Sequence, residues 1–333
     1  MPKRQLPGPL RWGAAGVAVL LAIAALAPLL APYDPTEQID PAGGLYRPPG
    51  TALHAVRLTD GGWRLAERVE RTPEGLKIER LGRVEALPAG RVANLTAEGV
   101  EDRRVFLLGS DKFGRDLLSR MLYGAQVSLA VGLISVILAL TLGVLLGSVA
   151  ALGGPVADTV VMRGVDALLS FPALFLIIAL AAFYDPGPFA IVVILGCMNW
   201  MGISRLVRAE LLSLRNRDFV LAARAMGQHP LATLRRHLLP NALAPALIQA
   251  ILMIGQIILV ESGLSFLGLG IRPPIPSWGN MIAEGREVLA SAWWVAVFPG
   301  AALAVTVIAF NLLGDGLRDA LDPRSPGATL PRL

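Results

Sequence analysis

The chain has 333 residues, of which 54% are apolar and only 17% are charged, and its mean hydropathy is +0.59. A typical soluble domain carries about 25% charged residues, so this composition excludes an ordinary soluble enzyme and a disordered chain. The formal net charge is nevertheless +5, which makes the position of the basic residues informative.

The cysteine, histidine and lysine residues exclude three further kinds of site. Cys197 is the only cysteine and lies in an apolar run, so no disulfide framework exists. The three histidines are too scattered for a zinc cluster. No lysine completes the pattern G-x-x-x-x-G-K-[ST], so no phosphate-binding loop of that kind is present. If the protein uses ATP, another chain must bind it.

Six stretches between charged residues are long and apolar enough to cross a bilayer, which requires about 20 apolar residues per helix. They lie near residues 12–31, 127–151, 160–183, 187–207, 245–269 and 293–315. The first could be a signal peptide, but it exceeds the core of about 7–15 residues that such peptides have. We therefore expect an all-α integral membrane protein with six transmembrane helices and an uncleaved first helix.

The placement of arginine predicts the orientation of these helices. With the N-terminus inside, the cytoplasmic segments are 1–11, 152–159, 208–244 and 316–333, and segment 208–244 carries six arginines against two acidic residues. Segment 32–126 has 14 basic and 14 acidic residues, a net charge of zero. The positive-inside rule therefore favours both termini in the cytoplasm. The basic pI reflects this topology, so no nucleic-acid partner is expected.

Residues 32–108 form the only extended polar region before the second span. Residues 55–58 and 63–65 flank a turn at Asp60-Gly61-Gly62, and a second pair of short strands flanks residues 72–75. Such spacing is typical of β-hairpins. We expect a small β-rich subdomain outside the membrane between the first two helices, with a disordered loop as the alternative.

Residues 109–126 predict a further element before the second span. Ser110 or Asp111 could cap a helix start, and Leu117, Met121 and Leu122 would share one apolar face. We expect an amphipathic helix at the membrane–water interface over 109–126.

The cytoplasmic loop over 208–244 predicts two short helices joined at a glycine. Asp218 is placed to cap the first helix and Gly227 to end it. Pro230 suits the first turn of the second helix, and Pro240-Asn241 is expected to stop that helix before the fifth span. A rigid, basic and partly apolar helix pair fits a docking surface, while an amphipathic pair facing anionic lipid is the alternative.

The spacing of Ala222-Ala223, Gly227 and Leu239-Pro240 resembles the "EAA" loop of ABC-importer permeases. Leu221 stands where the family pattern has glutamate, and His237 where it has isoleucine. Other segments resemble the C-type permease subunit of dipeptide, oligopeptide and nickel importers, over the first span and about 109–324 but not 43–108. They are Gly109-Ser110-Asp111 with Gly114-Arg115-Asp116 and Ser119-Arg120, Phe266-Leu267-Gly268-Leu269-Gly270, Pro276-Ser277-Trp278-Gly279, Ser291-Ala292-Trp293-Trp294, and residues 311–319 with Asp322-Pro323.

The resemblance implies a type I ABC importer permease fold in the bacterial inner membrane, with a permease core over 127–324 and a cytoplasmic tail over 325–333. It implies a non-enzymatic subunit without its own cofactor or metal. Its partners would be a homologous second permease, two ATP-binding cassette subunits that hold ATP and Mg, and an extracytoplasmic solute-binding protein. The implied ATPase-coupling residues are Asp218, Ala222, Ala223, Arg224, Gly227, Pro230, His237, Leu239, Pro240 and Asn241.

Two acidic residues at membrane depth are candidates for the translocation pathway, because charge there is costly without a role. Asp166 lies three residues after Arg163, a spacing that predicts a pair on one helix. Glu261 would either face the pathway and meet a peptide amine or bond to a neighbouring helix. A stand-alone secondary transporter is the alternative function, and dipeptides, longer peptides, nickel and opines remain open as substrates.

Overall fold

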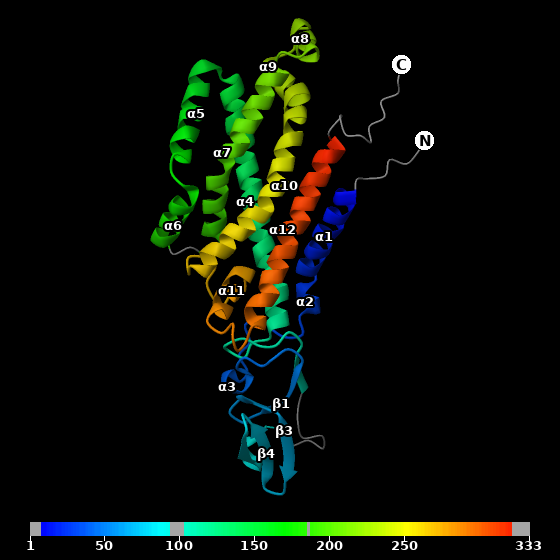
Figure 1. Ribbon diagram of the computed structural model, residues 1–333, viewed down its shortest axis with the longest axis vertical. Coiled ribbons are helices and arrows are strands. Elements are labelled where there is room, and N and C mark those ends of the chain that lie inside the picture. The colour runs from blue at the N-terminus through cyan, green and yellow to red at the C-terminus, as the bar shows by residue number, and fades with distance from the viewer. Residues whose placement is uncertain (1–7, 94–102, 185–186, 322–333) are drawn as a thin grey trace, which may run out of the picture. The chain divides into compact units, whose positions relative to one another are not determined.

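The computed structural model describes residues 8–93, 103–184 and 187–321 (Figure 1). The chain divides into two compact units. The helical unit comprises the described parts of Met1–Leu21, Ser128–Leu264 and Leu303–Leu333, and the sheet-bearing unit comprises the described parts of Ala22–Val127 and Ser265–Ala302. The helices are α1 (Gly8–Ala25), α2 (Ala27–Leu30), α3 (Pro41–Gly44), α4 (Leu117–Leu152), α5 (Gly154–Leu169), α6 (Ala173–Tyr184), α7 (Pro188–Leu214), α8 (Asp218–Ala225), α9 (Pro230–Thr233), α10 (Leu239–Phe266), α11 (Trp278–Arg286) and α12 (Trp294–Leu321).

Five helices in the described chain are long and apolar enough to cross a membrane, and a bent pair raises the number to six. The five are α1, α4, α7, a continuous helix over Leu231–Phe266 that contains α10, and α12. The predicted third span, 160–183, is instead two helices, α5 and α6, that meet at 82°. Pro172 lies at the break, and a proline disfavours helical backbone in the residue before it. The third span is therefore broken where the sequence predicts one helix.

Glycines bring the helices of the helical unit into backbone contact. A Cβ at Gly13 of α1 would lie 2.3 Å from the Leu313 nitrogen of α12, and one at Gly316 of α12 would lie 2.3 Å from the Leu10 nitrogen of α1. Such close approach of small residues is how membrane helices gain contact in the absence of a hydrophobic driving force. The predicted first span is therefore packed directly against the last.

The sheet-bearing unit contains the predicted β-rich insertion. Its strands are β1 (Thr51–Arg57), β2 (Trp63–Ala66), β3 (Arg68–Thr72), β4 (Gly75–Arg80), β5 (Arg83–Pro88) and β6 (Arg103–Phe106). They form two antiparallel sheets, ordered β2-β1-β6 and β3-β4-β5. Both predicted hairpins, β1–β2 and β3–β4, are confirmed, and a disordered loop is excluded for the described residues.

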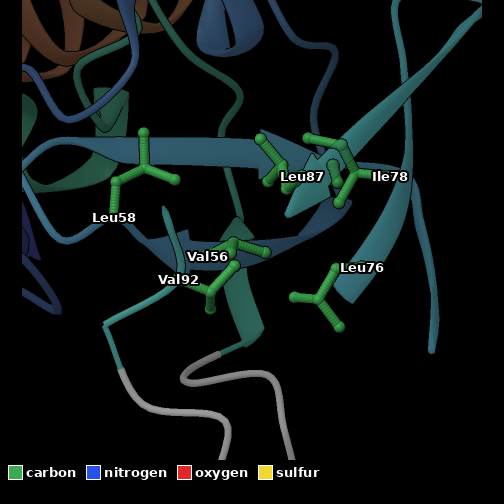
Figure 2. Close-up of a cluster of buried hydrophobic side chains, with 7 residues drawn as sticks. Val56, Leu58, Leu76, Ile78, Leu87 and Val92 are labelled. Atoms are coloured by element: carbon green, nitrogen blue, oxygen red, sulfur yellow. The ribbon is translucent and has the colours of Figure 1, made fainter. Parts of the chain in front are cut away.

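The two sheets share one hydrophobic core. Val56 and Leu58, from β1 and the residue after it, meet Leu76, Ile78 and Leu87 of the other sheet (Figure 2). Alternate residues of β4 point into this core, which is why the period-2 pattern of the sequence is informative there. The insertion therefore has its own core.

Replacing Ile78 by alanine is expected to destabilise the insertion by about 2–5 kcal/mol, because the side chain is completely buried and leaves a cavity. Limited proteolysis of the full-length protein in detergent should then cut within 51–106 faster than in the wild type. Val84→Ala, at an exposed β5 position, is the matched control and should change little. Equal protease resistance of both variants would contradict the assignment of this core.

The separate interfacial helix expected over 109–126 is not found. Residues 109–116 form a turn closed by an antiparallel bridge between Ser110 and Asp116, and α4 then runs without a break from Leu117 to Leu152. The Asp111 carboxylate accepts hydrogen bonds from the Phe113 and Arg115 amides inside this turn, at 2.8 and 3.0 Å. These bonds compete with helical backbone pairing, which keeps the turn out of the helix.

Candidate functional site

The loop predicted over 208–244 is largely helical. Helix α7 continues to Leu214, and only residues 215–217 and 226–229 lie outside helices before α10. The short helix α8 lies between these two breaks. The two-helix prediction is therefore confirmed in outline, but the connection is shorter than expected.

Gly227 ends α8 as predicted, through a paired hydrogen-bond motif. Its φ is +77°, a left-handed conformation that glycine adopts without steric cost. The Gly227 amide donates to the Arg224 carbonyl at 2.9 Å, and the Gln228 amide donates to the Ala223 carbonyl at 3.1 Å. This is a Schellman motif, which satisfies two carbonyl groups at the end of a helix and fixes the direction in which the chain leaves.

The predicted capping role of Asp218 is wrong. Arg217 occupies the N-cap position with extended backbone and makes no side-chain cap, while Asp218 is the first helical residue. Its carboxylate is nevertheless in the first turn, where the helix dipole favours negative charge. Asp218 therefore supports the start of α8 electrostatically.

Pro240 does not end the second helix. Helix α9 continues through a π-helical turn, η2 (Leu234–Leu238), into α10, and the Leu239 amide donates to the Leu234 carbonyl five residues back. Pro240 has no amide hydrogen, and its ring would clash with a carbonyl four residues earlier in a regular helix. The widened turn before it accommodates the ring, while the Asn241 side-chain amide donates to the His237 carbonyl at 2.6 Å. The second loop helix is therefore continuous with the spanning helix.

One side of α8 is packed against the chain and the other is exposed. The Phe219 ring lies 6.4 Å from the His237 ring of η2, and Val220 and Ala223 are buried. Leu221 of α8 and Met226, the residue that follows it, are exposed. Exposed residues in the predicted coupling set are Asp218, Ala222, Arg224, Gly227, Pro240 and Asn241, whereas Ala223 is buried and His237 and Leu239 are half-buried. Pro230 begins α9.

Asp166 pairs with a different residue from the one predicted. Its carboxylate lies 2.5 Å from the Arg205 guanidinium of α7, so the bridge joins two helices and does not involve Arg163. Asp158 of α5 and Arg208 of α7 form a second bridge, at 2.5 and 2.6 Å. These two ion pairs connect α5 to α7. Residue spacing within one helix could not have predicted them.

A double-mutant cycle on Asp166→Asn and Arg205→Gln should give a coupling free energy of about 0.2–1 kcal/mol, because both side chains are half exposed. The measurement is the unfolding of the detergent-solubilised protein by denaturant. Arg163→Gln is the matched control and should be additive with Asp166→Asn. A coupling free energy between Asp166 and Arg163, and none between Asp166 and Arg205, would contradict this ion pair and support the pairing predicted from the sequence.

Glu261 is completely buried in α10. Buried serines follow it at positions 262 and 265 of the same helix. Its role in the pathway stays a prediction.

A buried ion network in the sheet-bearing unit is absent from the sequence predictions. The Asp111 carboxylate pairs with Arg115 at 2.6 Å and with Arg120, and Glu284 of α11 pairs with Arg120 at 2.7 Å and with Arg115 at 3.3 Å. All four side chains are at most 7% exposed. Two cations and two anions balance, so the network removes four charges from solvent without leaving any of them uncompensated.

Further hydrogen bonds connect the 109–116 turn and the start of α4 to their surroundings. The Trp278 indole of α11 donates to the Met121 carbonyl at 3.2 Å, and the Trp294 indole donates to the Ser110 carbonyl at 3.2 Å. The Arg47 amide donates to the Ser110 hydroxyl oxygen at 2.7 Å. Burial raises the pKa of the neighbouring Asp116, whose carboxylate accepts two hydrogen bonds from Ser119 at 2.7 Å. The turn and the start of α4 are thus bonded to Arg47, α11 and α12.

Helix α11 is also absent from the sequence predictions. Ser277 accepts a hydrogen bond from the Asn280 amide, and the Asn280 side chain accepts one from the Ser277 amide, which is a reciprocal capping box. The Ser-x-x-Asn spacing is the one local signal that could have revealed this helix.

Known proteins resemble this chain in both sequence and fold. The family model described as "Binding-protein-dependent transport system inner membrane component" matches residues 143–325, more than half of the chain, but not the sheets. A "Putative peptide transport system permease protein" from Brucella suis biovar 1 (strain 1330) is 46% identical over 218 residues, which are 66% of this chain and 73% of the relative. The "Di/tripeptide transport system permease protein DppC" of Pseudomonas aeruginosa (strain UCBPP-PA14) is 43% identical over 223 residues, 67% of this chain and 74% of the relative.

Among solved structures, an inward-facing form of the MetNI methionine ABC transporter matches with a TM-score of 0.51 at 23% identity, over 62% of this chain and 96% of that chain. At this identity the likeness supports the fold alone, and that fold is the expected type I ABC importer permease. Together with the family match over α4 to α12, these similarities show that the chain belongs to the family of binding-protein-dependent transport system inner membrane components.

Proposed function

We propose that this chain is a permease subunit of an ATP-driven importer for peptides or closely related small solutes. Relatives that are 43–46% identical bear the names of peptide permeases, which supports this substrate class. The observation that carries the mechanism is the connection of α8 to a helix that runs without a break over Leu231–Phe266. A surface element joined to a spanning helix is what the transmission of a partner's movement requires.

The exposed residues of α8 and of its C-terminal end are the proposed ATPase contact. They combine apolar Leu221 and Met226 with basic Arg224, and Arg235 and Arg236 are exposed on η2. Apolar side chains in the centre of an interface and arginines around them are typical of specific protein contacts. The proposed assembly contains a homologous second permease, two ATP-binding cassette subunits that hold ATP and Mg, and an extracytoplasmic solute-binding protein.

The proposed orientation places both termini and α8 in the cytoplasm and the β-rich insertion outside. The arginines of segment 208–244 and the neutral charge balance of 32–126 support it. A Cys197→Ser background allows the orientation to be measured with single cysteines at Leu221 and Glu70. A membrane-impermeant thiol reagent added to intact cells should label position 70 but not position 221, and the reverse pattern would overturn the orientation.

Reconstituted transport tests the function itself. Proteoliposomes that contain this chain, its partner permease and the ATPases should take up peptide only when ATP and a loaded binding protein are present. Each subunit is omitted in turn as a control. Uptake by this chain alone, driven by an ion gradient, would favour a secondary transporter and refute the proposal.

A further inference from the structure

A groove of about 420 Å³ opens beside the buried ion network in the sheet-bearing unit. Its volume lies in the range of about 300–1,000 Å³ that small-molecule sites occupy. Three segments line it: the 109–116 turn, the chain that leaves α10, and the last turn of α11. The side chains that line it include Lys112, Phe266, Leu267, Ala283, Arg286 and Glu287.

Two cations in this groove are held against aromatic rings. The Lys112 ammonium lies 5.0 Å from the centre of the Phe113 ring, and the Arg286 guanidinium lies 4.9 Å from the centre of the Phe266 ring. Cation–π contacts of this kind stabilise the position of a charged side chain without using up its hydrogen-bond donors. Both cations can therefore donate to a ligand at little cost in side-chain ordering.

The charge balance of the groove favours an anion. Glu284 lines it, but Arg115 and Arg120 already compensate this carboxylate in the neutral network. Glu287 is 79% exposed and lies 3.9 Å from Arg286, which is a loose contact. The cations Lys112 and Arg286 and the anion Glu287 therefore give the groove a net charge of +1. The apolar side chains of Phe266, Leu267 and Ala283 also line it. An organic carboxylate with an apolar neighbour has the complementary chemistry.

We infer that this groove binds the C-terminal carboxylate of a peptide in transit, an inference that rests on the proposed function. Arg286 and Lys112 donate charge-assisted hydrogen bonds to the two carboxylate oxygens. The last side chain of the peptide contacts Phe266, Leu267 and Ala283. The groove therefore gives this chain its own requirement for a peptide with a free C-terminus.

Lysine labelling in the assembled importer tests the inference directly. The chain has three lysines, and exposed Lys77 on β4 serves as an internal reference for Lys112. A free-carboxylate peptide at millimolar concentration should slow acylation of Lys112 by about threefold, the slowing that two-thirds occupancy gives. The C-terminal amide of the same peptide should not slow it. Equal effects of the acid and the amide, or protection of Lys112 by the empty binding protein alone, would overturn the inference.

Transport by variants gives an independent readout. With the binding protein saturated by either ligand, Lys112→Gln combined with Arg286→Gln should reduce uptake of the free-carboxylate peptide by about a hundredfold, about tenfold for each of the two charge-assisted hydrogen bonds that are lost. Uptake of the amide should stay the same, and Lys77→Gln is the matched control. Equal loss for both ligands would show a structural role and refute the carboxylate site. If the wild-type importer takes up neither ligand, the proposed function fails instead.

Discussion

Glu284→Ala is expected to lower the free energy of unfolding by about 3–5 kcal/mol, the loss that follows when one partner of a buried ion pair is removed. Glu284 is the only member of the buried network that comes from α11, and its carboxylate compensates the guanidinium groups of Arg115 and Arg120. Its removal leaves excess positive charge in a site that is almost fully shielded from water. The cost of desolvating an uncompensated charge then falls on the folded state alone.

Denaturant unfolding of the detergent-solubilised protein measures this loss. Tryptophan fluorescence is a suitable signal, because the indoles of Trp278 and Trp294 hydrogen-bond to Met121 and Ser110 beside the network. Glu287→Ala is the matched control: its side chain is exposed and in the same stretch of chain, so we expect a change within about 0.5 kcal/mol. Similar unfolding curves for the two variants would contradict a stabilising role for the network.

Gly227→Val is expected to reduce ATP-coupled uptake by at least about tenfold while insertion and assembly continue. A β-branched residue in the left-handed region costs about 1–2 kcal/mol or more, enough to break the Schellman motif that orients α8. A Cβ at position 227 meets no atom within 4 Å, so the strain is confined to the backbone of the loop. The variant should therefore hydrolyse ATP in the complex without driving transport.

Parallel assays of peptide uptake and ATP hydrolysis in proteoliposomes test this uncoupling. Gly164→Val in α5 is the control, because its Cβ also meets open space but its backbone is not in the left-handed region. It should retain coupled uptake. Normal coupling in the Gly227→Val importer would count against α8 as the ATPase contact.

Local signals in the sequence predicted the parts of the molecule that depend on neighbouring residues. The alternation around Ile78 predicts a strand, and Gly227 predicts the end of a helix, because each depends on a few adjacent backbone bonds. Apolar runs predict the spanning helices for the same reason. Local rules also explain two of the errors: Pro240 lies in a helix because a π-helical turn makes room for it, and Pro172 marks a bend inside a predicted span.

Contacts between distant residues were not predictable from spacing. Arg120 and Glu284 are 164 residues apart, and no periodicity connects them. Asp166 has an arginine at helical spacing but binds Arg205, 39 residues away on another helix. The groove at Lys112 and Arg286 depends on the same kind of tertiary contact. Sequence reasoning therefore identified the loop at α8 but neither the network nor the groove.

The helix over Leu231–Phe266 also determines where bending can occur. Its 36 residues extend over about 54 Å, and two places in it lack the regular ladder of α-helical hydrogen bonds: the π-helical turn Leu234–Leu238 and Pro245. Helices kink at such points far more readily than elsewhere. A bend at either point changes the tilt of the residues that follow it relative to α8.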